Sequence, residues 1–180
     1  AAAASSAVVA EAHTKGEHPR HYRITRTEDL TSGGWVNKLG NNLEAIELLK
    51  TLERENRRAT AAEQDVLAQY IGWGGTELSK VLDPNPASIE DPKQREARTR
   101  LEALLTPNEL RSVMESVRAA HYSFVDLPRA IWTAVQHLGF AGGTILEPSV
   151  GTGHFLGTMP GTILVDPRTP RQSRVEANTL

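Results

Sequence analysis

Apolar residues recur at helical spacing over most of residues 41–138, with polar and charged residues between them. Side chains three and four positions apart lie on one face of a helix, so this pattern predicts a series of amphipathic helices joined by short loops. The positions expected to face the core are Ala45, Ile46, Leu49, Leu52, Val66, Leu67, Tyr70, Ile71, Ala97, Leu101, Leu104, Leu105, Leu110, Val113, Met114, Val117, Leu127, Ile131, Val135 and Leu138.

Three positions carry the spacing of a capping box, in which Asn or Thr is followed three residues later by Glu. The pairs are Asn41 with Glu44, Thr60 with Glu63, and Thr106 with Glu109. In such a box the cap side chain accepts from the third amide, while the acid accepts from the amide of the cap residue. We therefore expect helices to begin at these three places, and a further helix over 127–138 after the cap Asp126.

Residues 20–40 contain Ser32-Gly33-Gly34 and no sustained period, so they are predicted to be an irregular strap across the helices. Tyr22, Ile24, Leu30 and Trp35 are its candidate anchors. Trp73, which stands between glycines, has two interpretations. It is either a stacking surface for a ligand or, as is more usual, a side chain that fills a seam between helices.

The pattern changes after Gly142-Gly143. Residues 144–146 and 162–165 are short apolar runs typical of buried strands, and glycines at 151 and 153 follow the first run. Strand, glycine turn, short helix, strand and acid is the order in which a nucleotide-binding sheet begins. Glycine permits a sharp turn and close approach of a ligand, and the helix start would favour a carboxylate or phosphate. Asp166 is placed to accept hydrogen bonds from a ribose.

Composition narrows the classes of protein that fit. With 39% hydrophobic and 23% charged residues, the 180-residue chain is expected to fold around a core. A net charge of −2 excludes a strongly basic nucleic-acid coat protein, although a local basic patch stays open. The chain has no cysteine, hence no disulfide or thiolate metal site, which agrees with a cytoplasmic location. No apolar run reaches the ~18 residues of a membrane span.

No metal site is expected from the histidines near the start of the chain. His13, His18 and His21 have no compact ligand spacing, and no set of carboxylates converges on them.

Residues 146–155 read Leu-Glu-Pro-Ser-Val-Gly-Thr-Gly-His-Phe and resemble motif I of S-adenosylmethionine-dependent DNA methyltransferases that modify the adenine amine. Residues 120–124, Ala-His-Tyr-Ser-Phe, resemble their motif X. The chain is most similar to the methylase region of very large helicase–methylase proteins carried by phages, plasmids and integrative elements. The other stretches that share this similarity are 22–25, 41–50, 58–64, 70–75 and 105–109.

This resemblance implies a cofactor role for each matching residue. Tyr122 and Ser123 would contact the methionine end of S-adenosylmethionine, and Glu147 would lie near its amino group. Phe155 would pack under the turn, and Asp166 would bind the ribose hydroxyls. The residues that would shape the pocket are Glu147, Pro148, Gly151 and Gly153.

Two of these assignments have alternatives. Family members commonly show Val-Glu-Leu-Asp-Pro at the second strand, and aligning its end with Asp166 puts Leu164 where the Glu would be. The ribose contact of Asp166 therefore has an alternative, in which Asp166 matches the final Asp of that motif and Leu164 occupies the position of its Glu. Tyr122 is equally well explained as a half-buried aromatic that covers the edge of the sheet.

The Asn/Asp-Pro-Pro-aromatic motif that holds the target adenine in this family does not occur in the chain. No catalytic residue is therefore assigned, and methylation by this chain alone is not expected. The resemblance implies a truncated methyltransferase with an S-adenosylmethionine half site, which would act with DNA or with a catalytic remainder. The alternative is a mobile-element anti-defence protein, anti-restriction or anti-CRISPR, that binds a host defence complex.

Candidate contacts to DNA are Arg168, Arg171 and Arg174, because no acid follows them until Glu176. A solvated tail is the ordinary alternative. Two other basic sets are interleaved with acids and are expected to be solvated helix faces. Their members are Arg54, Arg57, Arg58, Lys93, Arg95, Arg98 and Arg100.

The predicted fold is mainly α with a partial α/β unit, in which a helical region packs on the first strands of an incomplete Rossmann-like methyltransferase sheet. The predicted parts are a flexible N-terminus (1–20), a helical region (21–118), a partial S-adenosylmethionine-binding unit (119–166) and a loose tail (167–180).

Overall fold

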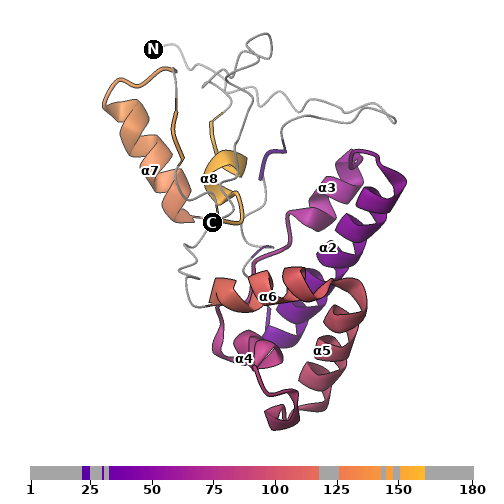
Figure 1. Ribbon diagram of the computed structural model, residues 1–180. Coiled ribbons are helices and arrows are strands. Elements are labelled where there is room, and N and C mark those ends of the chain that lie inside the picture. The colour runs from indigo at the N-terminus through magenta and orange to yellow at the C-terminus, as the bar shows by residue number, and fades with distance from the viewer. Residues whose placement is uncertain are drawn as a thin grey trace.

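The computed structural model describes residues 22–24, 30, 33–117, 126–142, 145–147 and 151–160. Most of these residues are helical (Figure 1). The helices are α2 (Trp35–Glu55), α3 (Ala61–Leu67), α4 (Thr76–Ser79), α5 (Pro92–Leu104), α6 (Pro107–Ser116), α7 (Asp126–His137) and α8 (His154–Gly157). Single 3₁₀ turns cover Lys80–Leu82 and Pro86–Ser88. None of the helices within these ranges is long and apolar enough to cross a membrane.

Helices α2 to α6 form one unit, the helical body (residues 33–117), in which α2 packs against α3, α4 and α5 (Figure 1). Burial of apolar side chains at this junction is the main stabilising term. The body confirms the predicted stripes at Ile46, Ala97 and Leu101, whereas Leu49 is exposed. Its buried core consists of Leu39, Leu43, Ile46, Trp73, Leu78, Val81, Leu82, Ala97 and Leu101.

Trp73 is fully buried in this core. Its indole N–H donates to the Tyr70 hydroxyl at 3.1 Å, so the polar end of the ring is satisfied inside the protein. The side chain therefore fills a seam between helices and is not available as a stacking surface.

The predicted capping boxes are confirmed at two of the three places. Thr60 with Glu63 begins α3, and Thr106 with Glu109 begins α6. The prediction at Asn41 is wrong, because α2 begins six residues earlier, at Trp35. The extra helical turns bury Leu39 and attach the Trp35 side chain to the core, which outweighs a local capping preference.

Asn42 shows what the interior of α2 is used for instead. This fully buried side chain donates from Nδ2 to the Gly72 carbonyl at 2.7 Å, and its Oδ1 accepts from the Ile71 N–H at 3.0 Å. One amide group thus satisfies both a donor and an acceptor of the loop before Trp73. This pairing fixes the loop against α2.

The predicted sheet is not supported, because the described part of the chain contains no strand. Residues 145 and 146 of the first predicted strand are exposed and irregular, and the second run, 162–165, lies outside the described residues. A strand exists only through pairing, and two short strands are too few to form a stable sheet alone. The fold of the described chain is therefore mainly α.

The predicted core face of α7 is also wrong. Leu127, Ile131 and Leu138 are exposed, and the helix buries Pro128 and Trp132 instead. The helical period identifies an apolar stripe, but it does not decide which face of the helix packs against the rest of the protein.

We expect replacement of Asn42 by Ala to lower the free energy of unfolding by about 1–3 kcal/mol, because the Ile71 N–H and the Gly72 carbonyl would remain buried without a partner. Urea denaturation measures this change. Asn41→Ala, at the adjacent and more exposed position of α2, is the matched control and should cost less than about 1 kcal/mol. Equal losses in the two variants would contradict the assigned role of Asn42.

The acids of the two capping boxes also give the body a pH dependence. The Arg57 guanidinium, followed by the Thr60 N–H, lowers the pKa of Glu63 to about 2. The Lys50 ammonium, followed by the Thr106 N–H, lowers the pKa of Glu109 to about 2. Both carboxylates are thus stabilised in their charged form by the folded chain.

An unfolded Glu has a pKa near 4.3, so this stabilisation is complete above about pH 4.3 and is lost as the pH falls towards 2. The free energy of unfolding should fall over that window, and the fall should be smaller in the double variant Glu63→Gln/Glu109→Gln. Urea denaturation at a series of pH values measures it, with the exposed Glu115→Gln as control. An unchanged acid dependence in the double variant would refute the prediction.

Candidate functional site

The glycine turn (residues 151–153) leads directly into α8, as the sequence predicted. Gly151 has a φ of 51° and Gly153 a φ of 81°, both in the left-handed region that other residues adopt only at a cost. Gly153 is the N-cap of α8. A Cβ placed on Gly153 would meet no atom within 4 Å, so the space beside the turn is open to a ligand.

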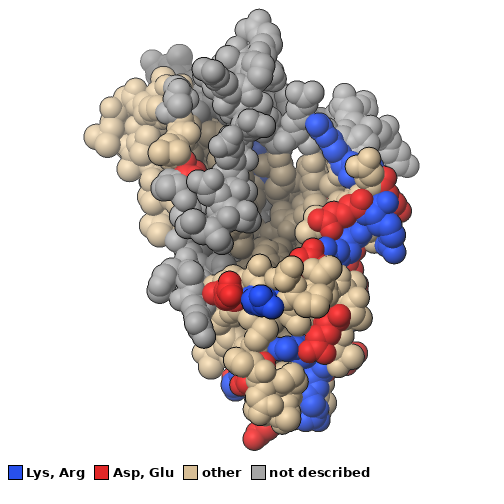
Figure 2. Space-filling view, in the orientation of Figure 1, with Lys and Arg blue, Asp and Glu red and all other residues tan. Residues whose placement is uncertain are grey.

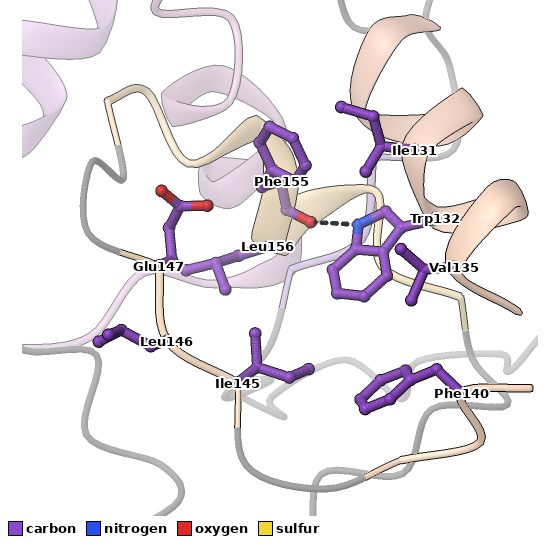
Figure 3. A pocket seen from close by; sticks show the side chains of 9 residues that line it. All are labelled: Ile131, Trp132, Val135, Phe140, Ile145, Leu146, Glu147, Phe155 and Leu156. Carbon is purple, nitrogen blue, oxygen red and sulfur yellow. Dashed lines mark hydrogen bonds between the residues drawn. The ribbon is translucent and has the colours of Figure 1, made fainter. Parts of the chain in front are cut away.

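A cavity of about 330 Å³ lies between α7, α8 and residues 145–147 (Figure 3). This volume is at the lower end of the range of small-molecule sites. The lining is largely apolar, and the half-buried Glu147 contributes the one carboxylate among the described lining residues. The lining residues are Ile131, Trp132, Val135, Phe140, Ile145, Leu146, Glu147, Phe155 and Leu156.

Trp132 joins the two helices that border the cavity. Its indole N–H donates to the Phe155 carbonyl at 2.9 Å, and the two rings meet edge to face with centroids 6.5 Å apart. Figure 3 shows this bond across the space between α7 and α8. The tryptophan is 7% exposed, so the bond is largely shielded from water and holds α8 against α7.

Of the predicted cofactor residues, the structure brings two to the cavity and places two more in the turn before α8. Glu147 and Phe155 line the cavity, while Gly151 and Gly153 form the turn that leads into α8. Phe155 packs against Trp132, a partner that the motif did not indicate. The predicted site residues that lie outside the described ranges are Tyr122, Ser123, Pro148, Asp166, Arg168, Arg171 and Arg174, and the same holds for His13, His18 and His21.

Trp132 was not predicted as a site residue. Its helix was identified, but the stripe Leu127, Ile131 and Val135 drew attention to the neighbouring face. The available signal was the position of a tryptophan beside that stripe, in a chain with only three. Its bond to a backbone carbonyl 23 residues away has no sequence signature.

Several basic residues of the helical body pair with nearby acids, as the interleaved charges predicted. Arg100 forms two hydrogen bonds to Glu47, at 2.7 and 2.8 Å. The expected solvated face is wrong for Arg98, which is buried and donates to Glu102 and to the carbonyls of residues 81 and 83. Figure 2 shows the resulting mixture of positive and negative groups over the body. On the face of the body that Figure 2 shows, the described residues form no continuous basic surface for DNA.

Within the described ranges, no group of three or more His, Asp or Glu side chains is arranged to hold a metal ion. Comparison with protein-family models, with curated proteins and with solved structures finds no match to this chain. The turn, the cavity and the residues that line it are therefore the features from which a function is inferred.

We expect Trp132→Phe to loosen α8, because it keeps an aromatic ring and removes the donor to the Phe155 carbonyl. Loss of one such hydrogen bond destabilises the packed position of α8 by about 1 kcal/mol. The fraction of molecules in which α8 is detached from α7 should therefore rise roughly fivefold. Limited chymotrypsin digestion should cleave after Phe155 about fivefold faster. Trp35→Phe, in the helical body, is the control and should leave this rate unchanged. Equal cleavage rates in wild type and Trp132→Phe would contradict the role of the bond.

Proposed function

We propose that the chain is methyltransferase-like and binds S-adenosylmethionine at the glycine turn, as one part of an adenine-specific DNA methylase. The observation behind the proposal is that the left-handed turn at Gly151 and Gly153 leads into α8, whose Phe155 lines one cavity together with Glu147. These are four of the residues that the resemblance to motif I assigns to the cofactor.

The cavity has the chemistry that this cofactor needs. Phe155, Trp132 and Phe140 offer aromatic surface to the adenine ring, and aromatic faces also attract a sulfonium cation. The Glu147 carboxylate suits the ammonium group of the methionine end, because a charged pair of this kind gives a strong hydrogen bond. The open space beside Gly153 allows the ligand to approach the backbone.

The surroundings of the cavity support an incomplete site. Of the seven exposed large hydrophobic residues in the described chain, two lie on α7, one directly follows it and two are residues 145 and 146. Leu138 and Leu146 are each 87% exposed. Ile131, Ile145 and Leu146 also line the cavity, and exposed apolar surface of this kind often marks a place where a partner binds. We assign it to a catalytic remainder that would supply the Asn/Asp-Pro-Pro-aromatic motif. Its strands would pair with 145–147 and complete a Rossmann-like sheet.

Methyl transfer belongs to the assembled protein in this proposal. An adenine must leave the duplex and enter a pocket before its amine can react, and the missing motif provides that pocket in the family. Arg168, Arg171 and Arg174 are the proposed contacts to the DNA phosphates. A cytoplasmic location follows from the need to reach DNA and the cofactor.

Calorimetric titration of the full chain with S-adenosylmethionine and with its demethylated product tests the proposal. We expect binding at micromolar concentrations, weakened about tenfold in Gly153→Ala, because a side chain at that φ costs about 1–2 kcal/mol and shifts the turn. Gly139→Ala is the matched control. Gly139, two residues beyond α7, has a φ of 92° and equally open surroundings.

The control variant should pay the same backbone cost and keep its affinity within about twofold. Thermal unfolding of both variants verifies that they are folded. Absence of heat with both compounds, or equal weakening by the two substitutions, would refute the proposal.

The exposed apolar face also favours a second candidate, an anti-defence protein that docks on a restriction or CRISPR complex. In that case a purified defence complex should bind the chain with the same affinity in the presence and absence of S-adenosylmethionine. Silent calorimetry together with such binding would favour this function over the first.

A further inference from the structure

Helix α8 is too short to hold its own position. It has four residues, and its hydrogen bonds are those of one turn, from the Gly157 N–H to the Gly153 carbonyl at 2.8 Å and from the Thr158 N–H to the His154 carbonyl at 3.0 Å. An isolated turn is unstable in water because nucleation is costly. Neighbouring segments must therefore set the position of α8 and of the glycine turn before it.

The backbone carbonyls of residues 155, 157 and 159, in and just after this helix, accept hydrogen bonds from other parts of the chain. Trp132 of α7 donates to the Phe155 carbonyl. From the other side, the Ile24 N–H donates to the Gly157 carbonyl at 2.7 Å, and Arg23 Nη1 donates to the Met159 carbonyl at 2.6 Å. Residues 22–24 belong to the strap predicted over residues 20–40 and are called the N-terminal strap from here on. They satisfy carbonyls at the end of α8 that have no partner inside the helix.

The strap also fits α8 sterically. A Cβ on Gly157 would lie 2.6 Å from Cδ1 and 2.7 Å from Cγ1 of Ile24, so the glycine provides the space that the isoleucine fills. Arg129 of α7 donates to the Ile24 carbonyl at 3.0 Å. Ile24 is buried and is held by both helices of the site.

The other end of the strap reaches the helical body. The Tyr22 hydroxyl donates to Asp65 of α3 at 2.8 Å, and partial burial together with this bond raises the pKa of Tyr22 to about 12. In Figure 1 the strap is the short indigo segment between α3 and α8. Three consecutive residues therefore contact α3, α7 and α8.

We propose that the N-terminal strap is a positioning element of the glycine turn and couples it to the helical body through Tyr22 and Asp65. Loosening the strap at α3 raises the mobility of α8, although Tyr22 makes no hydrogen bond to α8. Occupancy of the turn by a ligand stabilises the strap in return, because coupling between two sites is reciprocal. The ligand-dependent half of this inference rests on the proposed function.

Hydrogen exchange of the full chain, followed by mass spectrometry, tests the coupling without ligand. Tyr22→Phe keeps the ring and removes the donor to Asp65, and we expect about threefold to tenfold faster exchange at the Gly157 and Thr158 amides. Tyr70→Phe, which removes a tyrosine hydroxyl from the helical body, should leave these amides unchanged. If Tyr22→Phe alters the strap and α3 but not α8, or if both variants act alike, the coupling is refuted.

A pair of substitutions, one that enlarges Gly157 and one that shortens Ile24, tests the steric fit. Gly157→Ala should expel Ile24 and raise exchange at the Ile24 amide about tenfold or more, and adding Ile24→Ala should restore it to within about threefold. Gly40→Ala in α2, where a Cβ would meet nothing within 4 Å, is the control. Unchanged protection of Ile24 in Gly157→Ala, or no recovery in the double variant, would overturn the proposal even if the single variant partly unfolds.

The ligand measurement separates the two proposals. Saturation with S-adenosylmethionine should slow exchange at the Ile24 amide, and Tyr22→Phe should weaken binding about threefold or more. If no binding heat is found, the proposed function fails, while the ligand-free experiments still decide the role of the strap. Binding without any change at Ile24 would refute the coupling and leave the proposed function standing.

Discussion

A one-turn helix depends on its neighbours for its position, and this constraint governs the candidate site. The glycine turn leads into α8, whose carbonyls accept from Trp132 on one side and from the N-terminal strap on the other. Arg23 and its acceptor Met159 are 136 residues apart. A motif that is local in sequence therefore takes its geometry from contacts across almost the whole chain, and the proposed ligand binding at the turn would depend on those contacts.

The described side chains of the helical body and of the region around the cavity differ in burial. In the helical body, the buried polar groups Asn42, Gln94 and Arg98 have hydrogen-bond partners within the body, and a compact apolar core surrounds Trp73. Around the cavity, apolar side chains of α7 and residues 145–146 face solvent. In the proposal, a partner covers these exposed apolar side chains. Catalysis is therefore placed in an assembly.

The sequence predicted local features well. It predicted poorly those features that depend on which other segments of the chain lie opposite. Two capping boxes were found because their chemistry is complete within four residues, and the turn at Gly151 and Gly153 was found because few other residues adopt a positive φ. The start of α2 was misplaced because burial of Leu39 outweighs the local signal at Asn41. The inward face of α7, the role of Trp132 and the predicted strand at 144–146 depend on which segments lie opposite, and periodicity does not contain that information.

In the proposed function, the turn at residues 151–153 and the cavity lined by Glu147 and Phe155 bind an adenosyl sulfonium compound. The most direct test is a nitrogen-15 NMR titration of the full chain with S-adenosylmethionine. Binding at this site should give saturable shifts at the amides of Gly151, Gly153 and Phe155 and at the indole N–H of Trp132, with the amides of α5 unmoved. Saturable shifts confined to the helical body, or no shifts at millimolar ligand, would contradict it.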